Sequence, residues 1–320
     1  MISESFEQPL VIGIDAGGTR VRAYCADARG RVVGMGDSGP GNALSVPPAD
    51  LVRHLAQAMR AAAPEGVRSG VTAVAAGFAG AGLGRGRNTA ASCLAEALEA
   101  LDIGAAAAEV YGDADVAFAS GPGAPADGLV LIAGTGAIAG RVVGRRCAQT
   151  VDGHGWLLGD KGSGFWLGRE AVRAAVLALD GRGPWGPLVG SVLEQVTPDS
   201  PDAGLPPAVR TRLRDAIADW AYSRPPVALA RLSPLVVAAG ADGDPTARSL
   251  LDRAADELAD KVGALAPRSG ELLVTTGGLI GPEGPLAGRL VERVRPMGLR
   301  VAAVRDGAAG AVALARLLTQ

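Results

Sequence analysis

The sequence is poor in the residues that build metal clusters, disulfides and lysine-containing phosphate loops. It contains three Cys and two His, with no CxxC pair. This scarcity excludes a structural zinc site of the usual spacing and a disulfide framework. Of the 31 basic residues only two are Lys, namely Lys161 and Lys261, and neither follows a Gly. The GxxxxGK[ST] loop is therefore absent, which excludes a Walker-type nucleotide hydrolase.

The sequence also lacks an excess of charge of either sign and any long apolar run. Its formal net charge is −2 at pH 7, so it carries no electrostatic footprint for nucleic acid or for an acidic membrane surface. Apolar runs are interrupted by Gly or charged residues well before the roughly 18 residues of a membrane span. Residues 1–9 have no basic segment before an apolar stretch, and so do not resemble a signal peptide. We therefore expect a cytoplasmic protein that binds neither nucleic acid nor membrane.

What the sequence does contain predicts two compact α/β domains. Its 320 residues are 48% hydrophobic and 20% charged, which suits a globular chain with a sizeable core. Residues 10–16 form a short apolar run that ends in a glycine turn, and residues 20–26 and 31–35 alternate in polarity. This pattern predicts an antiparallel meander. A strand, a glycine turn containing Thr and a further strand recur at residues 130–143, as at 11–24.

The remaining elements alternate between helices and strands. Helical periodicity is present at about 49–63, 88–101 and 163–179 and over most of 205–264, whereas 183–205 is rich in Pro and Gly. Further strands are predicted at 71–77, 108–112, 129–133, 145–150, 271–276 and 299–304, followed by a closing helix at 307–318. Each half thus combines an antiparallel hairpin with parallel strands.

The first glycine turn, at residues 15–19, has the composition of a phosphate site. Glycines at Gly17 and Gly18 allow positive φ and let successive N–H groups form an anion nest. Asp15 at the strand end is suited to hold Mg²⁺ through water, and Thr19 is suited to donate to a phosphate oxygen. An ordinary hairpin turn with a capping Asp explains the same residues equally well.

The second glycine turn repeats this chemistry at Gly134, Thr135 and Gly136. Together with Gly140 it imitates a dinucleotide-binding GxGxxxG pattern. That site requires a helix to begin at the turn, whereas residues 139–144 are typical of a strand. The two turns therefore predict two hairpins that close on the phosphates of a nucleotide.

Five segments in order carry a resemblance to a known family. They are IGIDAGGTRVRAY (12–24), VYGDADVAFAS (110–120), LIAGTGAIAG (131–140), TTGGLIGP (275–282) and RDGAAGAVALA (305–315). With these segments the chain resembles the BadF/BadG/BcrA/BcrD-type ATPases, in the branch of N-acetylglucosamine and glucosamine kinases within the actin-like (sugar kinase/Hsp70/actin) superfamily. The loop GHGWLLGDKGSGFWLG at 153–168 resembles the amino-sugar kinases in particular.

The resemblance implies an α/β fold of two actin-like ATPase (ribonuclease H-like) domains that flank a nucleotide and sugar cleft. The first domain would span residues 1–118 and be joined by the C-terminal helix at 307–320. The second would span 119–306, with a helical insertion at about 183–264. The resemblance further implies ATP and Mg²⁺ as cofactors, an amino sugar as the small-molecule partner and a homodimer.

The resemblance also assigns roles to individual residues. Asp113 is implied as general base and sugar contact, and Asp15 as the residue that supports the metal. The residues implied to bind ATP are Gly17, Gly18, Thr19, Gly134, Thr135, Gly136, Gly277 and Gly278. Those implied to bind the sugar, besides Asp113, are Asn42, Gly153, His154 and Asp160.

Most of these residues have a purely structural alternative. Asp113 or Asp115 would cap the following helix, with Asp115 the capping or surface residue if Asp113 is the base. Asp160 would cap the helix at 163–179, and Asn42 would be a left-handed turn residue. His154 would be an ordinary exposed His, and Gly277 and Gly278 would form a helix-entry turn.

The expected activity is transfer of the ATP γ-phosphate to the 6-hydroxyl of an amino sugar, N-acetylglucosamine or glucosamine. N-acetylmannosamine, N-acetylmuramic acid and glucose remain open as substrates. The alternative is an ATPase of the same family that acts as an activator or sugar sensor without kinase activity. Activators of that kind hold an iron–sulfur cluster on cysteines, whereas Cys25, Cys93 and Cys147 are scattered along this chain.

Overall fold

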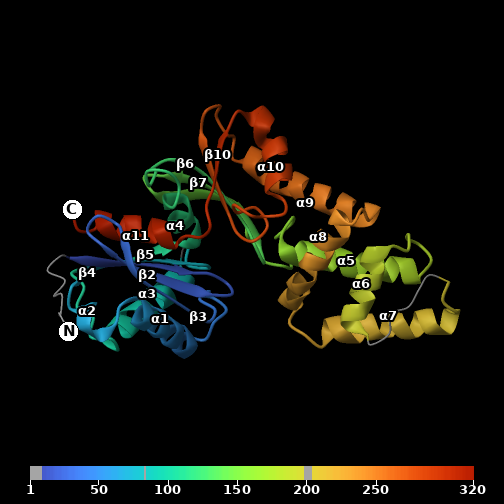
Figure 1. The fold of residues 1–320 in the computed structure, drawn as a ribbon, viewed down its shortest axis with the longest axis horizontal. Helices are drawn as coiled ribbons and strands as arrows, with labels where there is room; N and C mark the ends of the chain where they lie inside the picture. The colour runs from blue at the N-terminus through green and yellow to red at the C-terminus, as the bar shows by residue number, and fades with distance from the viewer. Residues whose placement is uncertain (1–8, 83, 198–203) are drawn as a thin grey trace.

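Two five-stranded sheets organise the computed structural model, which describes residues 9–82, 84–197 and 204–320 (Figure 1). The first sheet has the order β3-β2-β1-β4-β5, in which β1, β2 and β3 are antiparallel and β4 and β5 run parallel to β1. The predicted opening meander is therefore confirmed. The strands of this sheet are β1 (Leu10–Ala16), β2 (Val21–Asp27), β3 (Val32–Ser38), β4 (Val71–Phe78) and β5 (Ala107–Gly112).

The second sheet repeats the first in topology. Its order is β10-β9-β6-β7-β8, with β6, β7 and β8 antiparallel and β9 and β10 parallel to β6. Because β7 directly follows the second glycine turn, no helix starts there, as the sequence predicted. The strands are β6 (Gly128–Ala133), β7 (Ala137–Val143), β8 (Arg146–Asp152), β9 (Leu272–Thr276) and β10 (Arg300–Ala303).

Helices cover both faces of the first sheet. The alternation of β1 sends Leu10, Ile12 and Ile14 into one core cluster and Val11 into another on the opposite face. The C-terminal helix lies so close to β1 that a Cβ at Gly13 would be 2.2 Å from the backbone nitrogen of Val312. The first face is covered by α1 (Pro48–Ala62) and α3 (Arg85–Glu99), the second by α4 (Asp113–Ala119) and α11 (Ala308–Leu317), and α2 (Glu65–Arg68) precedes β4.

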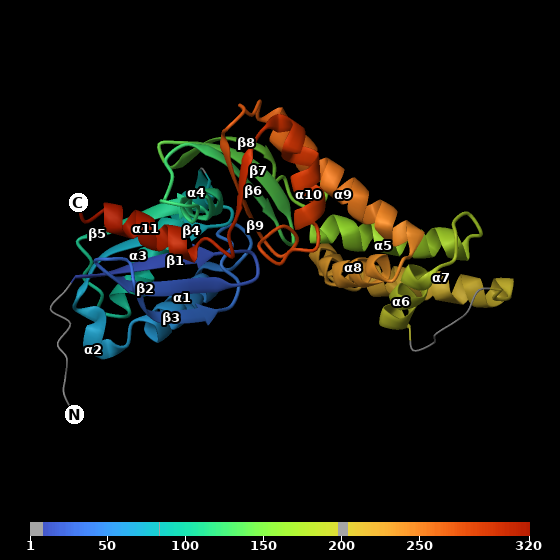
Figure 2. The ribbon, with the colours of Figure 1, turned by 45° about the horizontal axis from the view of Figure 1, so that its top comes forward.

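A helical segment between β8 and β9 extends away from both sheets (Figure 2). It contains α5 (Gly164–Leu179), α6 (Pro187–Val196), α7 (Pro207–Tyr222), the 3₁₀-helix η1 (Pro226–Leu232), α8 (Ser233–Ala241) and α9 (Pro245–Ala264). After β9 follow α10 (Ala287–Val294) and the 3₁₀-helix η2 (Arg295–Met297). Among the residues that the structure describes, no helix is both long and apolar enough to cross a bilayer.

Helix α6 lies within the stretch that the sequence presented only as rich in Pro and Gly. Pro187 lies in the first turn, where backbone N–H groups have no acceptor within the helix, so proline costs no helical hydrogen bond there. Leu188, Val192 and Leu193 are buried on one side of the helix, so apolar packing outweighs the composition of the segment. Part of this stretch, residues 198–203, lies outside the described residues.

Candidate active site

Asp113 is the first residue of α4, directly after β5. It is half-buried, and its Oδ1 accepts a hydrogen bond of 2.9 Å from the N–H of Ala114. Asp115 performs the capping of this helix, because its Oδ2 accepts from the N–H of Gly112 at 2.9 Å. Asp115 is only 5% exposed and also accepts from the N–H of Cys147 at 2.6 Å. Of the two roles considered for Asp115 the cap is confirmed, and the surface position is wrong.

The environment of Asp113 favours its protonated form more than water does. Burial raises the pKa of the Asp113 carboxyl to about 7, and the negative charges of Asp15 and Asp115 add to the shift. A carboxyl with a pKa near neutrality is well matched to accept and release a proton at physiological pH.

Asp15 lies at the same edge of the first sheet as Asp113. β1 and β5 run parallel on either side of β4, so their carboxyl ends bring both side chains to one edge. The Oδ2 of Asp15 accepts a hydrogen bond of 3.0 Å from the N–H of Gly307, and Arg22 Nη1 is 3.8 Å from the same oxygen. Burial nevertheless raises the pKa of Asp15 above its usual value.

The donors at this edge fit one mode of Mg²⁺ binding. In the described part of the chain no group of three or more His, Cys, Asp or Glu forms an all-protein metal cage. Mg²⁺ commonly binds through one or two carboxylates, with substrate phosphates and water completing its shell. Asp15, which is close enough to raise the pKa of Asp113, offers a carboxylate of that kind.

The two glycine turns differ in how firmly they are held. In the first, the N–H of Gly17 donates to the carbonyl of Arg20 at 2.9 Å and its carbonyl accepts from Gly41 at 2.8 Å, while Gly18 and Thr19 are exposed. In the second, the carbonyls of Gly134 and Thr135 accept hydrogen bonds of 2.8 and 3.1 Å from the N–H groups of Gly164 and Phe165 at the start of α5. Gly136 closes this turn by accepting from Gly134 at 2.9 Å.

Gly277 brings the segment after β9 against the end of β6. Its φ is +100°, and a Cβ there would be 2.3 Å from the carbonyl oxygen of Ala133. Gly278 is exposed, and a Cβ added there would meet nothing within 4 Å. Since the next helix begins only at Ala287, the helix-entry alternative for Gly277 and Gly278 is wrong.

Asp160 points its carboxylate at the second glycine turn. Its Oδ1 accepts a hydrogen bond of 3.0 Å from the N–H of Ala137, and a Cβ at Gly136 would be 2.9 Å from the same oxygen. Burial raises the pKa of Asp160. The N-cap of α5 is Ser163, whose Oγ accepts from the N–H of Trp166 at 3.1 Å. The capping alternative for Asp160 is therefore wrong.

The other residues expected to contact sugar lie in exposed or partly exposed loops. Asn42 Oδ1 accepts from the N–H groups of Leu44 and Ser45 at 2.9 and 3.1 Å. Its backbone does not have positive φ, so the left-handed alternative is wrong. Gly153, with φ +75°, and His154 are exposed after β8.

The residues predicted from sequence fall into two groups. One group lies on or beside the first sheet and contains Asp15, the turn at 17–19, Asn42 and Asp113. The other lies on or beside the second sheet and contains the turn at 134–136, Gly153, His154, Asp160, Gly277 and Gly278. Within the described ranges no hydrogen bond or ion pair joins a member of one group to a member of the other.

Sequence reasoning missed the residue that ties the two halves together beside Asp113. Arg146 on β8 donates to the carbonyl of Val110 at 3.0 Å, pairs with Glu109, and stacks 3.7 Å above the ring of Tyr111. It also lies 3.8 Å from Asp115 Oδ2. Arg is one of the commonest residues in this chain, so nothing in the sequence distinguished Arg146.

A family model and one known kinase match this chain over nearly its whole length, and a second kinase matches part of it. The model of the BadF/BadG/BcrA/BcrD ATPase family matches residues 12–315. An N-acetyl-D-glucosamine kinase of Dictyostelium discoideum is 27% identical over 305 residues, which cover 89% of this chain and 90% of that protein. An N-acetylmuramic acid/N-acetylglucosamine kinase of Clostridium acetobutylicum is 38% identical over 86 residues, or 27% of this chain and 28% of that protein.

Solved structures show the same fold. A protein from Chromobacterium violaceum assigned as an N-acetylglucosamine kinase superposes with a TM-score of 0.72 and 26% identity, over 96% of this chain and 99% of that one. A ROK family glucokinase from Streptomyces griseus superposes with a TM-score of 0.53 and 18% identity, over 96% and 99% of the two chains. These matches confirm the predicted fold class, and the chain belongs to the BadF/BadG/BcrA/BcrD ATPase family.

Proposed function

We propose that this chain, an ATP-dependent sugar kinase, transfers the ATP γ-phosphate to the 6-hydroxyl of an amino sugar, N-acetylglucosamine or glucosamine. The observation that carries the proposal is Asp113, whose pKa is raised to about 7 and whose helix is capped by Asp115 instead. A half-buried carboxyl that is not needed for the fold of its own helix is available for proton transfer. The N-acetyl-D-glucosamine kinase that matches 89% of the chain supports the choice of substrate.

In the proposed reaction Asp113 is the general base. Its ionised carboxylate accepts the proton of the attacking hydroxyl while that oxygen forms a bond to the γ-phosphorus. The bond between the γ-phosphorus and the β,γ-bridging oxygen breaks, and ADP leaves with the electron pair. The proton then rests on a carboxyl whose pKa near 7 allows its release to water before the next turnover.

The nucleotide would be held by backbone groups of both halves. The turns at 17–19 and 134–136 present N–H groups and the hydroxyls of Thr19 and Thr135 to the phosphates. Gly277 and Gly278 would let the adenosine lie against bare backbone, and the exposed position of Gly278 leaves that backbone accessible. Asp15 would hold Mg²⁺, and when bound the ion would neutralise charge on the phosphate oxygens.

The sugar would lie between loops of the two halves. The Asp160 carboxylate accepts hydrogen bonds from ring hydroxyls, and Asn42, Gly153 and His154 line the same site. Loops at about 40–46 and 153–156 would surround the 2-amino substituent. Closure of the two halves on both substrates would exclude water from the γ-phosphate.

We also propose the domain division expected from the sequence, with residues 1–118 and 119–306 as the two domains. The helical insertion at about 183–264 would belong to the second domain. The packing of α11 on β1 at Gly13 supports assigning the C-terminal helix to the first domain. The homodimer and the cytoplasmic location stay predictions.

The decisive experiment is ADP release from MgATP by the purified chain with a panel of sugars. The panel contains glucosamine, N-acetylglucosamine, N-acetylmannosamine, N-acetylmuramic acid and glucose, beside a control without sugar. We expect strong stimulation by N-acetylglucosamine or glucosamine and a 6-phosphate product. ADP release that no sugar stimulates would contradict the proposal and favour the ATPase activator or sugar sensor.

A further inference from the structure

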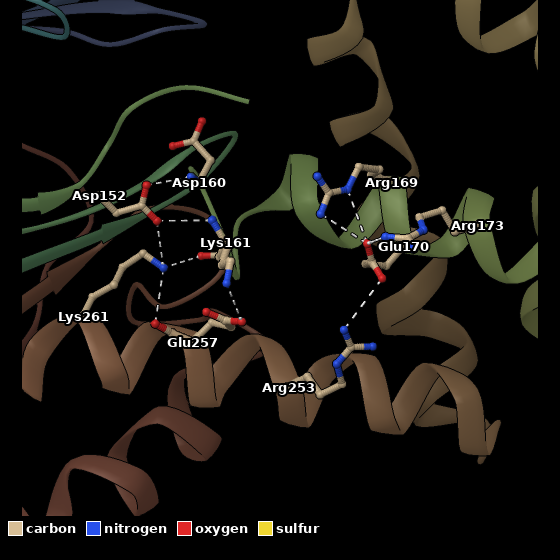
Figure 3. A network of polar contacts seen from close by, with 9 residues as sticks. All are labelled: Asp152, Asp160, Lys161, Arg169, Glu170, Arg173, Arg253, Glu257 and Lys261. Carbon is tan, nitrogen blue, oxygen red and sulfur yellow. Dashed lines mark hydrogen bonds and ion pairs between the residues drawn. The ribbon is translucent and has the colours of Figure 1, made fainter. Parts of the chain in front are cut away.

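A buried ion pair joins the end of β8 to the long helix α9. Lys261 on α9 is 5% exposed, and its Nζ lies 3.1 Å from Oδ2 of Asp152, whose side chain is 12% exposed (Figure 3). The same ammonium donates to the carbonyls of Lys161 and Glu257 at 2.6 and 3.3 Å. All three of its donors thus have an acceptor, which is the condition under which a charge tolerates burial.

The partner carboxylate closes the loop that follows it. Asp152 Oδ1 accepts from the N–H of Asp160 at 2.7 Å, and its Oδ2 accepts from the N–H of Lys161 at 3.3 Å. A Cβ at Gly159 would be 2.0 Å from Oδ1, so this position has room only for glycine. The loop at 153–160 therefore follows Asp152 in the chain and returns to it, since both oxygens of the Asp152 side chain bind backbone N–H groups where the loop ends.

This closure holds two residues in an unfavourable backbone conformation. The φ angles are +65° at Asp152 and +58° at Asp160, a region that costs a non-glycine residue about 1–3 kcal/mol. Such a conformation persists only where surrounding contacts impose it. Here the contacts are the hydrogen bonds that Asp152 accepts, and the Asp152 carboxylate is itself paired with the ammonium of Lys261.

The conformation of Asp160 determines where its carboxylate points. With its N–H on Asp152, the side chain of Asp160 is directed away from Lys261 (Figure 3). Its Oδ1 reaches the N–H of Ala137 at 3.0 Å, beside the second phosphate turn. A chain of contacts therefore runs from Lys261 on α9 through Asp152 and Asp160 to the second glycine turn.

We propose that Lys261 and Asp152 are positioning residues for the sugar site. Together they fix the loop at 153–160 so that the Asp160 carboxylate faces both the sugar and the second glycine turn. The inference rests on the proposed role of Asp160 as a sugar contact. A buried ion pair contributes little net stability compared with apolar residues of the same size. Its contribution here is the conformation that it imposes on the loop at 153–160.

The two lysines of the chain provide the variant and its control. Lys261→Met removes the buried charge, whereas Lys161→Met removes an exposed one that lies 3.5 Å from Glu257 and is 61% exposed. Because Lys261→Met leaves Asp152 buried without its partner and so destabilises the fold, the principal variant is the double Asp152→Asn/Lys261→Met. Asp160→Asn serves as the reference for loss of the sugar contact.

Each variant is assayed for the KM of N-acetylglucosamine, the KM of ATP, kcat and Tm. We expect the double variant to keep a Tm near the wild type while its sugar KM rises about tenfold or more, as for a misplaced binding group. The KM of ATP should stay near the wild-type value. Lys161→Met should resemble the wild type in all four quantities.

The outcomes separate this inference from the function on which it rests. A wild-type sugar KM in the folded double variant, together with a raised one in Asp160→Asn, would overturn the positioning role alone. A wild-type sugar KM in Asp160→Asn would overturn the proposed sugar site itself. Should the double variant not fold, Asp152→Asn alone, which leaves the Lys261 ammonium its two carbonyl acceptors, is measured against the same criteria.

Discussion

The two halves of the chain repeat one topology but use the equivalent strand-to-helix turn differently. In the first half β5 leads to Asp113 and α4, and in the second β10 leads to Asp306 and α11. Asp306 is 9% exposed, accepts from the N–H of Ala308 at 3.1 Å and lies 3.7 Å from Arg22 Nε. Its carboxylate thus accepts a hydrogen bond from the N-terminus of α11 and pairs with Arg22.

Asp113 occupies the matching place with one backbone partner, the N–H of Ala114, and without an ion pair to an arginine among the described residues. Its helix is capped by Asp115, and its pKa is raised to about 7 by burial and by neighbouring carboxylates. The comparison teaches that equivalent positions in the two sheets hold carboxylates with different partners. The two carboxylates differ because Asp115 caps the helix that follows Asp113, whereas Asp306 itself accepts a hydrogen bond from the helix that follows it.

Replacing the two aspartates should have opposite consequences, and this contrast is the largest effect that we predict. Asp113→Asn should lower kcat by about 10²–10⁴-fold, the usual contribution of a general base. ATP affinity should be unchanged, because the proposed contact of the carboxylate is with the sugar hydroxyl and not with the nucleotide. Asp306→Asn should instead lower Tm, through loss of the charge beside Arg22, and retain most of kcat.

Steady-state kinetics and thermal unfolding of both variants check this contrast. If Asp306→Asn lost as much kcat as Asp113→Asn at equal stability, the distinction between base and cap would be wrong. Near wild-type turnover in Asp113→Asn would remove that residue as the base.

Neighbouring glycines after β9 offer a second contrast of intermediate size. Gly277→Ala should destabilise the fold by about 1–3 kcal/mol, the cost of overpacking, because its Cβ would lie 2.3 Å from the carbonyl oxygen of Ala133 at a φ of +100°. Gly278→Ala meets nothing within 4 Å and should leave Tm unchanged. If Gly278 lies against adenosine, its variant should raise the KM of ATP.

Denaturant unfolding measures the first effect and ATP kinetics the second. Equal stabilities of the two alanine variants would contradict the close approach of Gly277 to β6. An unchanged KM of ATP in Gly278→Ala would contradict the proposed adenosine contact.

A further predicted effect is a pH-dependent gain in stability when Asp113 is replaced. Its folded pKa of about 7 lies above the ordinary value of 3.8 for an Asp carboxyl, so between these values the folded state binds the proton more tightly than the unfolded chain. Stability contributed by this group is therefore present at low pH and is lost as pH rises through 7. Asp113→Asn should have a higher Tm than the wild type at pH 8, with the difference shrinking toward pH 4. An equal Tm at both pH values would mean that the pKa of Asp113 is not raised by burial.

The sequence was sufficient for much of the fold because the repeated strand–turn–strand pattern is local. The strand pattern of 10–16 and the following glycine turn predicted β1 and its hairpin without tertiary information. Helix α6 was missed because the Pro and Gly content of 183–205 was weighed above the helical spacing of its buried residues Leu188, Val189, Val192 and Leu193. In this segment packing overrides composition.

The candidate site was predictable to the extent that its residues lie in short motifs. Asp113, Asp160 and the glycine turns were proposed in this way and their roles stay predictions, whereas Ser163 as the N-cap of α5 was not predicted. Arg146 and Lys261 were missed because their partners are distant in sequence. Only the fold brings Lys261 to Asp152 and Arg146 to the strand before Asp113.

The pH dependence of kcat/KM for N-acetylglucosamine between pH 5 and 9 tests most directly whether ionised Asp113 accepts the proton. This quantity reports the ionisation of essential groups in the free enzyme. The account predicts a plateau above an apparent pKa of about 7 and a decline of about tenfold for each pH unit below it. A profile that stays flat from pH 8 to pH 5 in the folded wild-type protein would contradict the assignment of Asp113 as the base.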